Sequence, residues 1–360
     1  MSEPLKSPFP YFGGKSRCAA EVWRRFGRVG NYIEPFFGSG AVLLARPDFD
    51  DDDPPLEAAN DLNAWIANFF RAAQIEPEAV AAYADWPVHE LDLHARGDWL
   101  FYRKDVDREF VERLRSDPDW HDAKSAGWWV WGAGAWIGDN WGRISHNCRK
   151  DAEGQPCGVV HARPNLAGKK GLESGRVTRQ MPSILPSGVH QRGIRRKRPR
   201  LNDSGKGVHR KSLASLEAYI CSLRDRLRRV RFCCGDWSRV LGPSVLGAGS
   251  PCAVFLDPPY SVADRDAVYG EDESRDVAHD VREWCLARGD DRNLRLALCG
   301  YAGEHEALEA RGWDVWEWKA NGGYGSQAQA RGRENAGRER IWFSSGCREP
   351  EARLFEEAQP

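Results

Sequence analysis

Short apolar segments with strand character alternate with helical segments at both ends of this chain, and the alternation stops in the middle. Near the N-terminus, NYIEPF (31–36) and EAAND (57–61) are each followed by a helical segment. After residue 211 the predicted order is helix 213–230, strands 231–237 and 253–260, helix 274–288, strand 294–301, short helix 304–311 and a strand pair at 313–320 and 338–344. This alternation is typical of a mostly parallel sheet with helices on both faces. We therefore expect a doubly wound α/β fold.

The middle of the chain has a different character. Residues 76–211 contain a helical stretch, a Trp-dense run at 120–141 and a basic segment rich in Gly and Pro. A chain of 360 residues exceeds one average domain, so an insertion of this size is reasonable. We expect residues 1–75 and 212–346 to form one domain, 76–211 an inserted domain with a role of its own, and 347–360 a frayed tail.

The composition says more about the cellular compartment of the protein than about its binding partners. The ten cysteines, with no secretory leader, favour a reducing cytosol over a disulfide framework. No apolar run approaches the length of a membrane span, so we expect a cytoplasmic protein without a membrane partner. Nothing in the composition indicates an obligate protein partner. The formal net charge of −1 requires any nucleic-acid surface to be local.

A glycine turn between a predicted strand and a predicted helix is the first motif with chemical content. Glu34-Pro35-Phe36-Phe37-Gly38-Ser39-Gly40 ends a strand, and the glycines allow close approach of a ligand to the backbone. Asp61 ends the next predicted strand, where an acid suits the two hydroxyls of a ribose. The pair predicts a nucleoside ligand. Leu43 stands where a dinucleotide fingerprint has its third glycine, which argues against a nicotinamide dehydrogenase.

The second motif, Asp257-Pro258-Pro259-Tyr260, follows the apolar strand 253–256. Ligands of such folds bind at the carboxyl ends of the strands. The prolines stiffen the loop, so that a carboxylate and a carbonyl line one side of a pocket beside an aromatic ring. Two acceptors and a stacking surface suit an exocyclic amine on a base.

With these motifs the chain resembles the Dam-like family of N6-adenine DNA methyltransferases, in its phage-type branch. Tyr11-Phe12-Gly13-Gly14-Lys15 matches the family's N-terminal cofactor loop, with Tyr in place of the usual Trp. The resemblance implies a methyltransferase fold that uses S-adenosylmethionine as cofactor and double-stranded DNA as substrate, in a prokaryotic cell or a phage-infected host. It also implies that residues 1–75 and 212–346 form the catalytic domain and that 76–211 form an inserted target-recognition domain. The implied cofactor residues are Tyr11, Gly14, Lys15, Glu34, Pro35, Phe36, Gly38, Gly40, Asp61, Asp236 and Asp257. The implied catalytic residues are Asp257, Pro258, Pro259 and Tyr260.

The chemistry implied by the resemblance is a direct displacement. The base leaves the duplex and Tyr260 stacks on it. Asp257 and the Pro258 carbonyl accept hydrogen bonds from the two N–H groups of the adenine amine. Three alternatives remain: cytosine N4 methylation, whose enzymes more often carry Ser at the first position of the tetrapeptide; methylation of RNA or of a protein amide; and a DNA-binding relative without activity.

The segment 189–211 has nine Lys or Arg residues against one acid, Asp203. Inside an insertion of a DNA enzyme this predicts contact with phosphates, against the alternative of a solvated loop. The cations that we expect to contact DNA are Arg192, Arg195, Arg196, Lys197, Arg198, Arg200 and Arg210.

Two further groups of residues in the insertion receive structural interpretations. The Trp run (Trp128, Trp129, Trp131, Trp136 and Trp141) is interpreted as a small core rather than a base-stacking surface. His146, Cys148, Cys157 and His161 do not have the spacing of the usual zinc fingers, so we expect no metal.

Overall fold

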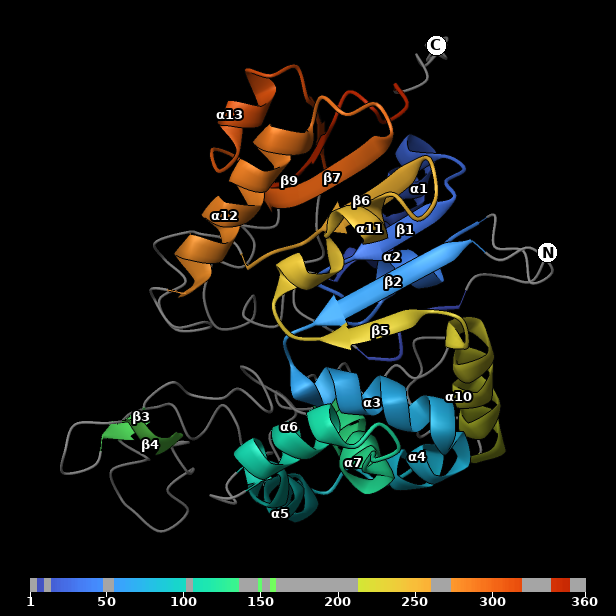
Figure 1. Ribbon diagram of the computed structural model, residues 1–360. Helices are drawn as coiled ribbons and strands as arrows, with labels where there is room; N and C mark the ends of the chain where they lie inside the picture. Colours follow the sequence, from blue (N-terminus) through green and yellow to red (C-terminus); the bar gives the residue numbers. More distant parts are fainter. Residues whose placement is uncertain are drawn as a thin grey trace, which may run out of the picture.

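The structure is a computed structural model that describes residues 5–9, 14–47, 55–101, 106–135, 148–150, 156–159, 213–259, 273–318 and 338–349. Its centre is a seven-stranded sheet in the order β5-β2-β1-β6-β7-β9-β8 (Figure 1). The strands are β1 (Asn31–Glu34), β2 (Leu56–Asp61), β5 (Arg231–Cys234), β6 (Cys252–Leu256), β7 (Leu294–Tyr301), β8 (Asp314–Glu317) and β9 (Glu339–Phe343). Six of them run in the same direction, whereas β9 runs antiparallel to its neighbours β7 and β8. The sheet is therefore mixed, with an antiparallel edge.

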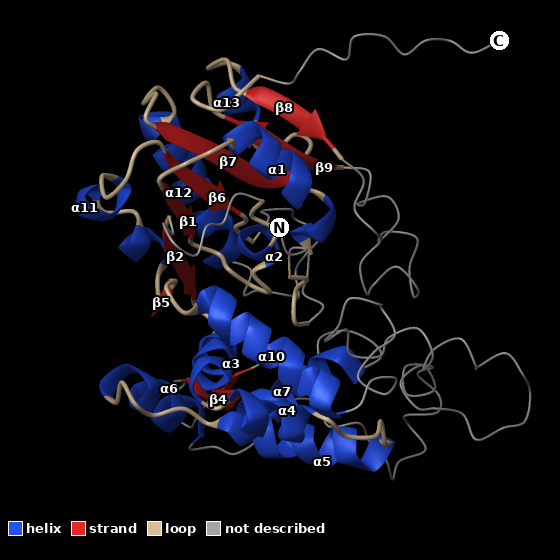
Figure 2. Ribbon diagram, turned by 90° about the vertical axis from the view of Figure 1, so that its right-hand side faces the viewer, coloured by secondary structure: helices blue, strands red, loops and turns tan. Residues whose placement is uncertain are grey.

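Helices cover both faces of this sheet. One face carries α1 (Ala19–Phe26), α2 (Ala41–Leu44), α3 (Ala64–Ile75) and α10 (Leu213–Leu227), and the other carries α11 (Pro243–Leu246), α12 (Glu273–Arg288) and α13 (Glu306–Glu309). Figure 2 shows α1 and α2 on one side of the strands and α11 and α12 on the other. Two short 3₁₀ helices, η1 (Lys15–Arg17) and η4 (Trp237–Val240), adjoin the loops of the sheet.

Strand residues alternate between the two hydrophobic cores. In β6, Ala253 and Phe255 belong to the core on the α1 side, whereas Val254 and Leu256 belong to the core on the α12 side. Because successive side chains of a strand point to opposite faces, an apolar strand such as this one must be buried on both sides. The uninterrupted run of apolar residues at 252–256 is thus typical of a central strand.

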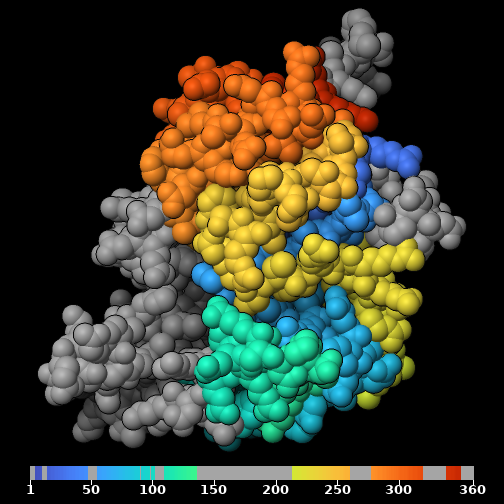
Figure 3. Space-filling model, in the orientation of Figure 1, coloured from blue at the N-terminus to red at the C-terminus, as the bar shows by residue number. Residues whose placement is uncertain are grey.

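A group of helices extends from the β5 edge of the sheet and lies in the connection from β2 to β5 (Figure 1). It consists of α4 (Pro77–Ala84), α5 (Glu90–Phe101), α6 (Val106–Ser116) and α7 (Ala123–Ala135), and it packs on α3 and α10. A small hairpin, β3 (Cys148–Lys150) with β4 (Pro156–Val159), follows it. Figure 3 shows α3 to α7 in blue and green against the yellow residues of α10 and β5.

The helical group shares one core with the sheet domain. Ala81 of α4 and Trp129 of α7 belong to the same buried cluster as Phe69 of α3 and Leu223 of α10. The predicted boundary at residue 76 therefore falls between two helices that pack together. The division into a catalytic and an inserted domain stays a prediction.

Other expectations of the sequence differ in detail. The helix expected after Gly40 is only one turn long. Pro47 lies shortly after its end and disfavours a helical conformation at the preceding residue, Arg46. Residues 347–349, expected to fray, are tied to the sheet domain, since the Arg348 N–H donates to the Arg25 carbonyl (2.8 Å) and Cys347 donates to Leu296. Among the described residues, no helix is long and apolar enough to cross a membrane.

Candidate active site

The predicted motifs meet where the strand order reverses. Strands β2 and β5 lie on one side of β1, whereas β6 and β7 follow on the other. The loops that leave β1 and β6 therefore diverge from neighbouring parallel strands, which is where doubly wound sheets bind ligands. Tyr32 pairs with Ala253 and Ile33 with Val254, so Glu34 and Asp257 come close to each other at the carboxyl edge.

The glycine turn after β1 has a backbone that requires glycine. Gly38 and Gly40 have φ angles of 50° and 67°, in the left-handed region. A Cβ on Gly40 would lie 2.5 Å from Cζ of Phe37. The Phe37 ring is itself buried against Phe70 and Phe232, with centroids 4.9 and 5.4 Å away, so it cannot retreat. An aromatic cluster thus holds the turn in place at the carboxyl edge of the sheet.

Asp61 holds this turn through its carboxylate. Oδ2 accepts the Gly38 N–H at 2.8 Å, and Oδ1 accepts the Asn63 N–H at 2.8 Å. Burial raises the pKa of Asp61 to about 6, against the opposing effect of these two hydrogen bonds. A carboxylate has about four lone-pair positions, so two N–H donors leave acceptor capacity for the hydroxyls of a ligand. Asp61 can serve both the loop and a bound ribose.

Asn60, in β2, joins two of the site's loops, and the sequence motifs did not single it out. Its Nδ2 donates to the carbonyls of Pro35 (3.0 Å) and Gly235 (2.9 Å), and its backbone carbonyl accepts the Phe37 N–H. The loops after β1 and β5 are therefore both tied to this buried residue of β2. The available signal was a polar residue preceding Asp61 in a strand that is buried on both faces.

Asp257 follows β6 and forms an ion pair with Lys15. The distance from Lys15 Nζ to Asp257 Oδ1 is 2.8 Å, and the two side chains are 5% and 19% exposed. Burial works to lower the pKa of Lys15, but the Asp257 carboxylate, with Cys299 and Glu339 beyond it, outweighs burial and holds that pKa above its usual value. Lys15 is thus a permanent cation beside the predicted catalytic carboxylate.

Glu339 and Cys299 complete the surroundings of Lys15. Both are buried, Glu339 at the start of β9 and Cys299 in β7. Burial, followed by the negative charge of Asp257, raises the pKa of Cys299 well above its usual value, so this thiol is not a nucleophile. The sequence indicated a terminal strand at 338–344 but did not connect Glu339 with the site, because that placement depends on the antiparallel pairing of β9 with β7.

Glu34 is buried at the end of β1, and both of its observed partners use Oε2. The Tyr32 hydroxyl donates to it at 2.9 Å and the Leu43 N–H at 3.2 Å. Burial raises the pKa of Glu34 well above its usual value despite these hydrogen bonds. In this structure Glu34 fixes α2 to β1, and its expected contact with a cofactor stays a prediction.

The loop after β5 contributes an exposed carboxylate and an aromatic stack. Asp236 caps η4, since its Oδ1 accepts the Ser238 N–H at 2.9 Å as well as the Ser238 hydroxyl. Trp237 stacks on Phe36, with ring centroids 6.2 Å apart and planes 22° apart. The loops after β1 and β5 therefore also meet through their aromatic side chains.

Several predicted residues lie outside the described part of the chain. These are Tyr11, Tyr260, the basic residues 192–210, Trp136, Trp141, His146 and His161. Cys148 and Cys157 lie on β3 and β4. Trp129 and Trp131 are buried, as a core role requires, but they do not form one small core of the insertion. Trp129, with the partly buried Trp128, belongs to the core that is shared with the sheet domain, whereas Trp131 packs with Leu93 and Ala135.

Comparison with known proteins gives one family. Residues 11–117 match the family described as D12 class N6 adenine-specific DNA methyltransferase. The match begins at the Lys15 loop and includes the glycine turn, Asp61 and most of the helical group. A search of curated proteins finds no match to the chain.

Proposed function

Because residues 11–117 match the family of D12 class N6 adenine-specific DNA methyltransferases, we propose that the chain transfers a methyl group from S-adenosylmethionine to the N6 amine of adenine at a specific sequence in double-stranded DNA. The observation that carries the proposal is the meeting of the glycine turn and Asp257 at the ends of the neighbouring strands β1 and β6. One motif suits a nucleoside-containing donor and the other suits an amine acceptor.

The donor set at the carboxyl edge fits S-adenosylmethionine. The Asp61 carboxylate suits its ribose hydroxyls, the Gly38–Gly40 turn lets it approach the backbone, and Asp236 lies on the loop where the resemblance places its adenine. When bound, S-adenosylmethionine supplies an electrophilic methyl group on a positively charged sulfur.

The acceptor side of the reaction rests on Asp257. Its carboxylate and the Pro258 carbonyl accept hydrogen bonds from the two N–H groups of the amine and direct the nitrogen lone pair toward the methyl carbon. The N–C bond forms as the S–C bond breaks, and one proton leaves the amine for solvent. Lys15, whose Nζ lies 2.8 Å from Oδ1, orients the carboxylate.

Methylation of this amine requires the adenine to leave the base stack. The ring of Tyr260, next to the two prolines, is assigned to stack on the extruded base. The basic segment 189–211 and the helical group before it form the candidate surface for the duplex.

Analysis of the product base tests the proposal. The protein is incubated with duplex DNA and methyl-labelled S-adenosylmethionine, and the DNA is digested to nucleosides. Label in N6-methyladenine is expected. Label in N4-methylcytosine would assign the chain to the other amine, and absence of label despite DNA binding would indicate the silent relative. Single-stranded DNA and RNA of the same sequence serve as controls for the substrate class.

A further inference from the structure

Helix α2 is too short to hold its own shape. It has four residues, Ala41–Leu44, directly after the Gly38–Gly40 turn, and an isolated single turn is unstable because nucleation of a helix is costly. Side chains from other elements hold it instead. Trp23 Nε1 donates to the Val42 carbonyl at 2.7 Å, and the Leu43 N–H donates to Glu34 Oε2 at 3.2 Å. The end of the turn thus depends on partners outside it.

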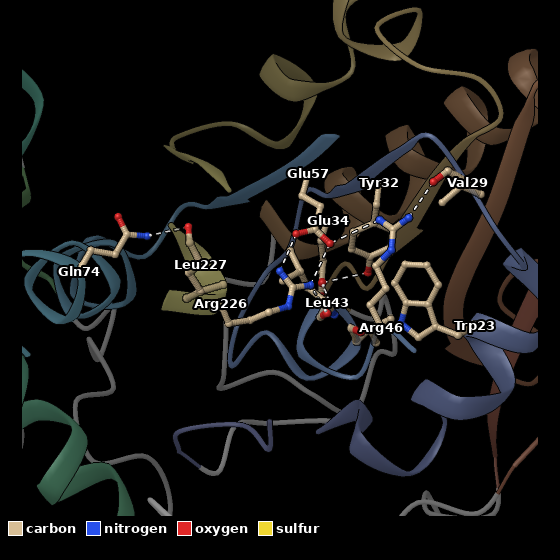
Figure 4. A network of polar contacts seen from close by, with 11 residues as sticks. Trp23, Val29, Tyr32, Glu34, Leu43, Arg46, Glu57, Gln74, Arg226 and Leu227 are labelled. Atoms are coloured by element: carbon tan, nitrogen blue, oxygen red, sulfur yellow. Dashed lines mark hydrogen bonds and ion pairs between the residues drawn. The ribbon is translucent and has the colours of Figure 1, made fainter. Parts of the chain in front are cut away.

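The third such partner is Arg226, near the end of α10. Its Nη2 donates to the Leu43 carbonyl at 3.0 Å, while Nη1 and Nη2 donate to Glu57 Oε2 and Oε1 at 2.7 and 2.9 Å (Figure 4). This bidentate pair fixes the plane of the guanidinium group. Glu57 is 2% exposed and Arg226 is 10% exposed, so water competes little for either group.

Arg46 supports Glu57 from the other side. The distance between Arg46 Nη1 and Glu57 Oε1 is 3.4 Å, Nη2 donates to the Val29 carbonyl at 2.7 Å, and the guanidinium lies 4.9 Å from the Trp23 ring (Figure 4). Trp23 in turn holds Val42. Arg46, Glu57 and Arg226, which we call the Glu57 cluster, therefore surround α2 with connected contacts.

A buried ion cluster can serve stability alone, and such clusters are often replaceable by apolar residues. The position of Nη2 argues for a second role here. One nitrogen serves both the Glu57 carboxylate and the Leu43 carbonyl, and the amide of the same Leu43 is bound to Glu34 at the start of the glycine turn. Leu43 is therefore the one residue that links the guanidinium of Arg226 to the loop expected to bind the methyl donor.

We propose that Arg226 is a positioning residue of the methyl-donor site, which sets the conformation of the Gly38–Gly40 turn by holding α2 through the Leu43 carbonyl. This inference rests on the proposed function, because it assigns the turn to S-adenosylmethionine. It predicts that loss of Arg226 weakens donor binding more than it slows methyl transfer at saturating donor, because Arg226 lies behind the turn and Asp257 is untouched.

The test compares Arg226→Met and Arg226→Lys with Arg224→Met, a control on the same helix whose residue pairs with the adjacent Asp225. Calorimetry gives the Kd for S-adenosylmethionine per folded molecule, and kinetics give KM and kcat. Arg226→Met is expected to raise Kd and KM about tenfold or more, the effect of one oriented charge-assisted hydrogen bond, with kcat within about twofold. Arg226→Lys should fall between Met and wild type, and Arg224→Met should match wild type.

Unchanged donor affinity in folded Arg226→Met would overturn the inference, as would a fall in kcat at unchanged KM. If the Met variant does not fold, Glu57→Gln takes its place, since it loosens the same guanidinium while filling the same volume. A folded Glu57→Gln variant with wild-type donor affinity would then overturn it. Failure of the wild-type protein to bind S-adenosylmethionine would instead reject the proposed function.

Discussion

Three carboxylates of the site are held by different kinds of partner. Asp257 faces the Lys15 ammonium, Asp61 receives two backbone N–H groups, and Glu34 receives a hydroxyl and one N–H. A full positive charge stabilises a carboxylate more than neutral donors do. Burial raises the pKa values of Asp61 and Glu34, the two carboxylates whose partners are neutral donors.

Donor binding should weaken at mildly acidic pH through Asp61. The pKa of Asp61 is raised to about 6, so its carboxylate gains a proton as the pH falls through that value and becomes a poorer acceptor for ribose hydroxyls. If only the ionised form binds, affinity should fall about tenfold at pH 5 relative to pH 7, as linkage requires. Asp61→Asn should bind weakly with a flat profile between pH 5 and 7. Calorimetry at several pH values measures this, and a flat wild-type profile would contradict it.

Protonation of Asp61 should favour folding although it weakens donor binding. The folded pKa of Asp61 lies above the unfolded value, so the folded state takes up the proton first as the pH is lowered. This group alone therefore disfavours folding at neutral pH, and that penalty is relieved as the pH falls through about 6 toward 3.8. Donor affinity and stability should move in opposite directions in this window.

Replacement of Asp257 by Ala should abolish turnover without abolishing donor binding. The loss of one oriented acceptor typically lowers the rate by on the order of 10²–10³. The substitution also leaves Lys15 as a buried cation without its closest carboxylate, so stability should fall as well. Single-turnover kinetics, normalised to the folded fraction, measure the effect. Near-normal turnover would remove Asp257 from the mechanism.

At this scale the sequence predicted the motif residues but not those that hold them. Gly38, Gly40, Asp61 and Asp257 lie in loops after strands, as expected, because local turn chemistry specifies such positions. Asn60, Glu339 and Arg226 act through partners far away in the sequence. Their roles follow from strand pairing and helix packing, which one sequence does not display.

Helices α4 and α7 illustrate how elements of this protein approach each other. A Cβ on Gly127 of α7 would lie 2.4 Å from Cβ of Tyr83, 2.8 Å from the Val80 carbonyl oxygen and 3.0 Å from the Ala84 nitrogen. Two of these neighbours are backbone atoms of α4, so they cannot rotate away. The absence of a side chain at residue 127 therefore sets the separation of the two helices.

Gly127→Ala should push α7 away from α4. Overpacking of a tight contact typically costs about 1–3 kcal/mol, which outweighs the gain of about 1 kcal/mol in helix propensity. Urea unfolding measures the difference. Gly242→Ala is the control, because that residue has a φ of −65° and no atom lies within 4 Å of the added Cβ. Equal or greater stability of the Gly127 variant would show that the two helices can separate freely.

Element types in the sheet domain were predictable, since strands buried on both faces and amphipathic helices leave clear patterns. Helix α10 at Leu213–Leu227 and α12 at Glu273–Arg288 agree closely with the predicted ranges. The one-turn α2 was not distinguished from a longer helix. Pro47 limits the length of α2, whereas contacts from Trp23, Glu34 and Arg226 hold its single turn, and only the proline can be read from the local sequence.

For the molecule as a whole, the alternating pattern predicted a doubly wound sheet but not its strand order. The order β5-β2-β1-β6-β7-β9-β8 and the antiparallel edge depend on pairings between distant segments. The surface that binds DNA is also a property of the whole chain, because the net charge of −1 supplies no general attraction. We therefore expect DNA affinity to come from local cations such as those of 189–211.

Replacing Arg195, Arg196, Lys197 and Arg198 by Ala should weaken binding to all DNA sequences. If all four contact phosphates, the slope of log affinity against log salt should flatten by up to about four units, at roughly 0.9 per contact. The Kd for S-adenosylmethionine should stay unchanged, which controls for folding. Titrations at several salt concentrations measure the slope. An unaltered slope and affinity would identify the segment as a solvated loop.

The interleaved strand order has a consequence for synthesis on the ribosome. Strands β1 and β2 are translated early, but β5 and β6, which cover their two outer edges, follow only after residue 230. At about 5–20 residues per second, the delay is roughly 10–40 s. During that time the nascent pair exposes two open strand edges, which favour pairing with other chains. A polypeptide stalled before residue 231 would therefore contain the glycine turn and Asp61 but neither neighbour of their strand pair, so donor binding is acquired only after the second half of the chain has emerged.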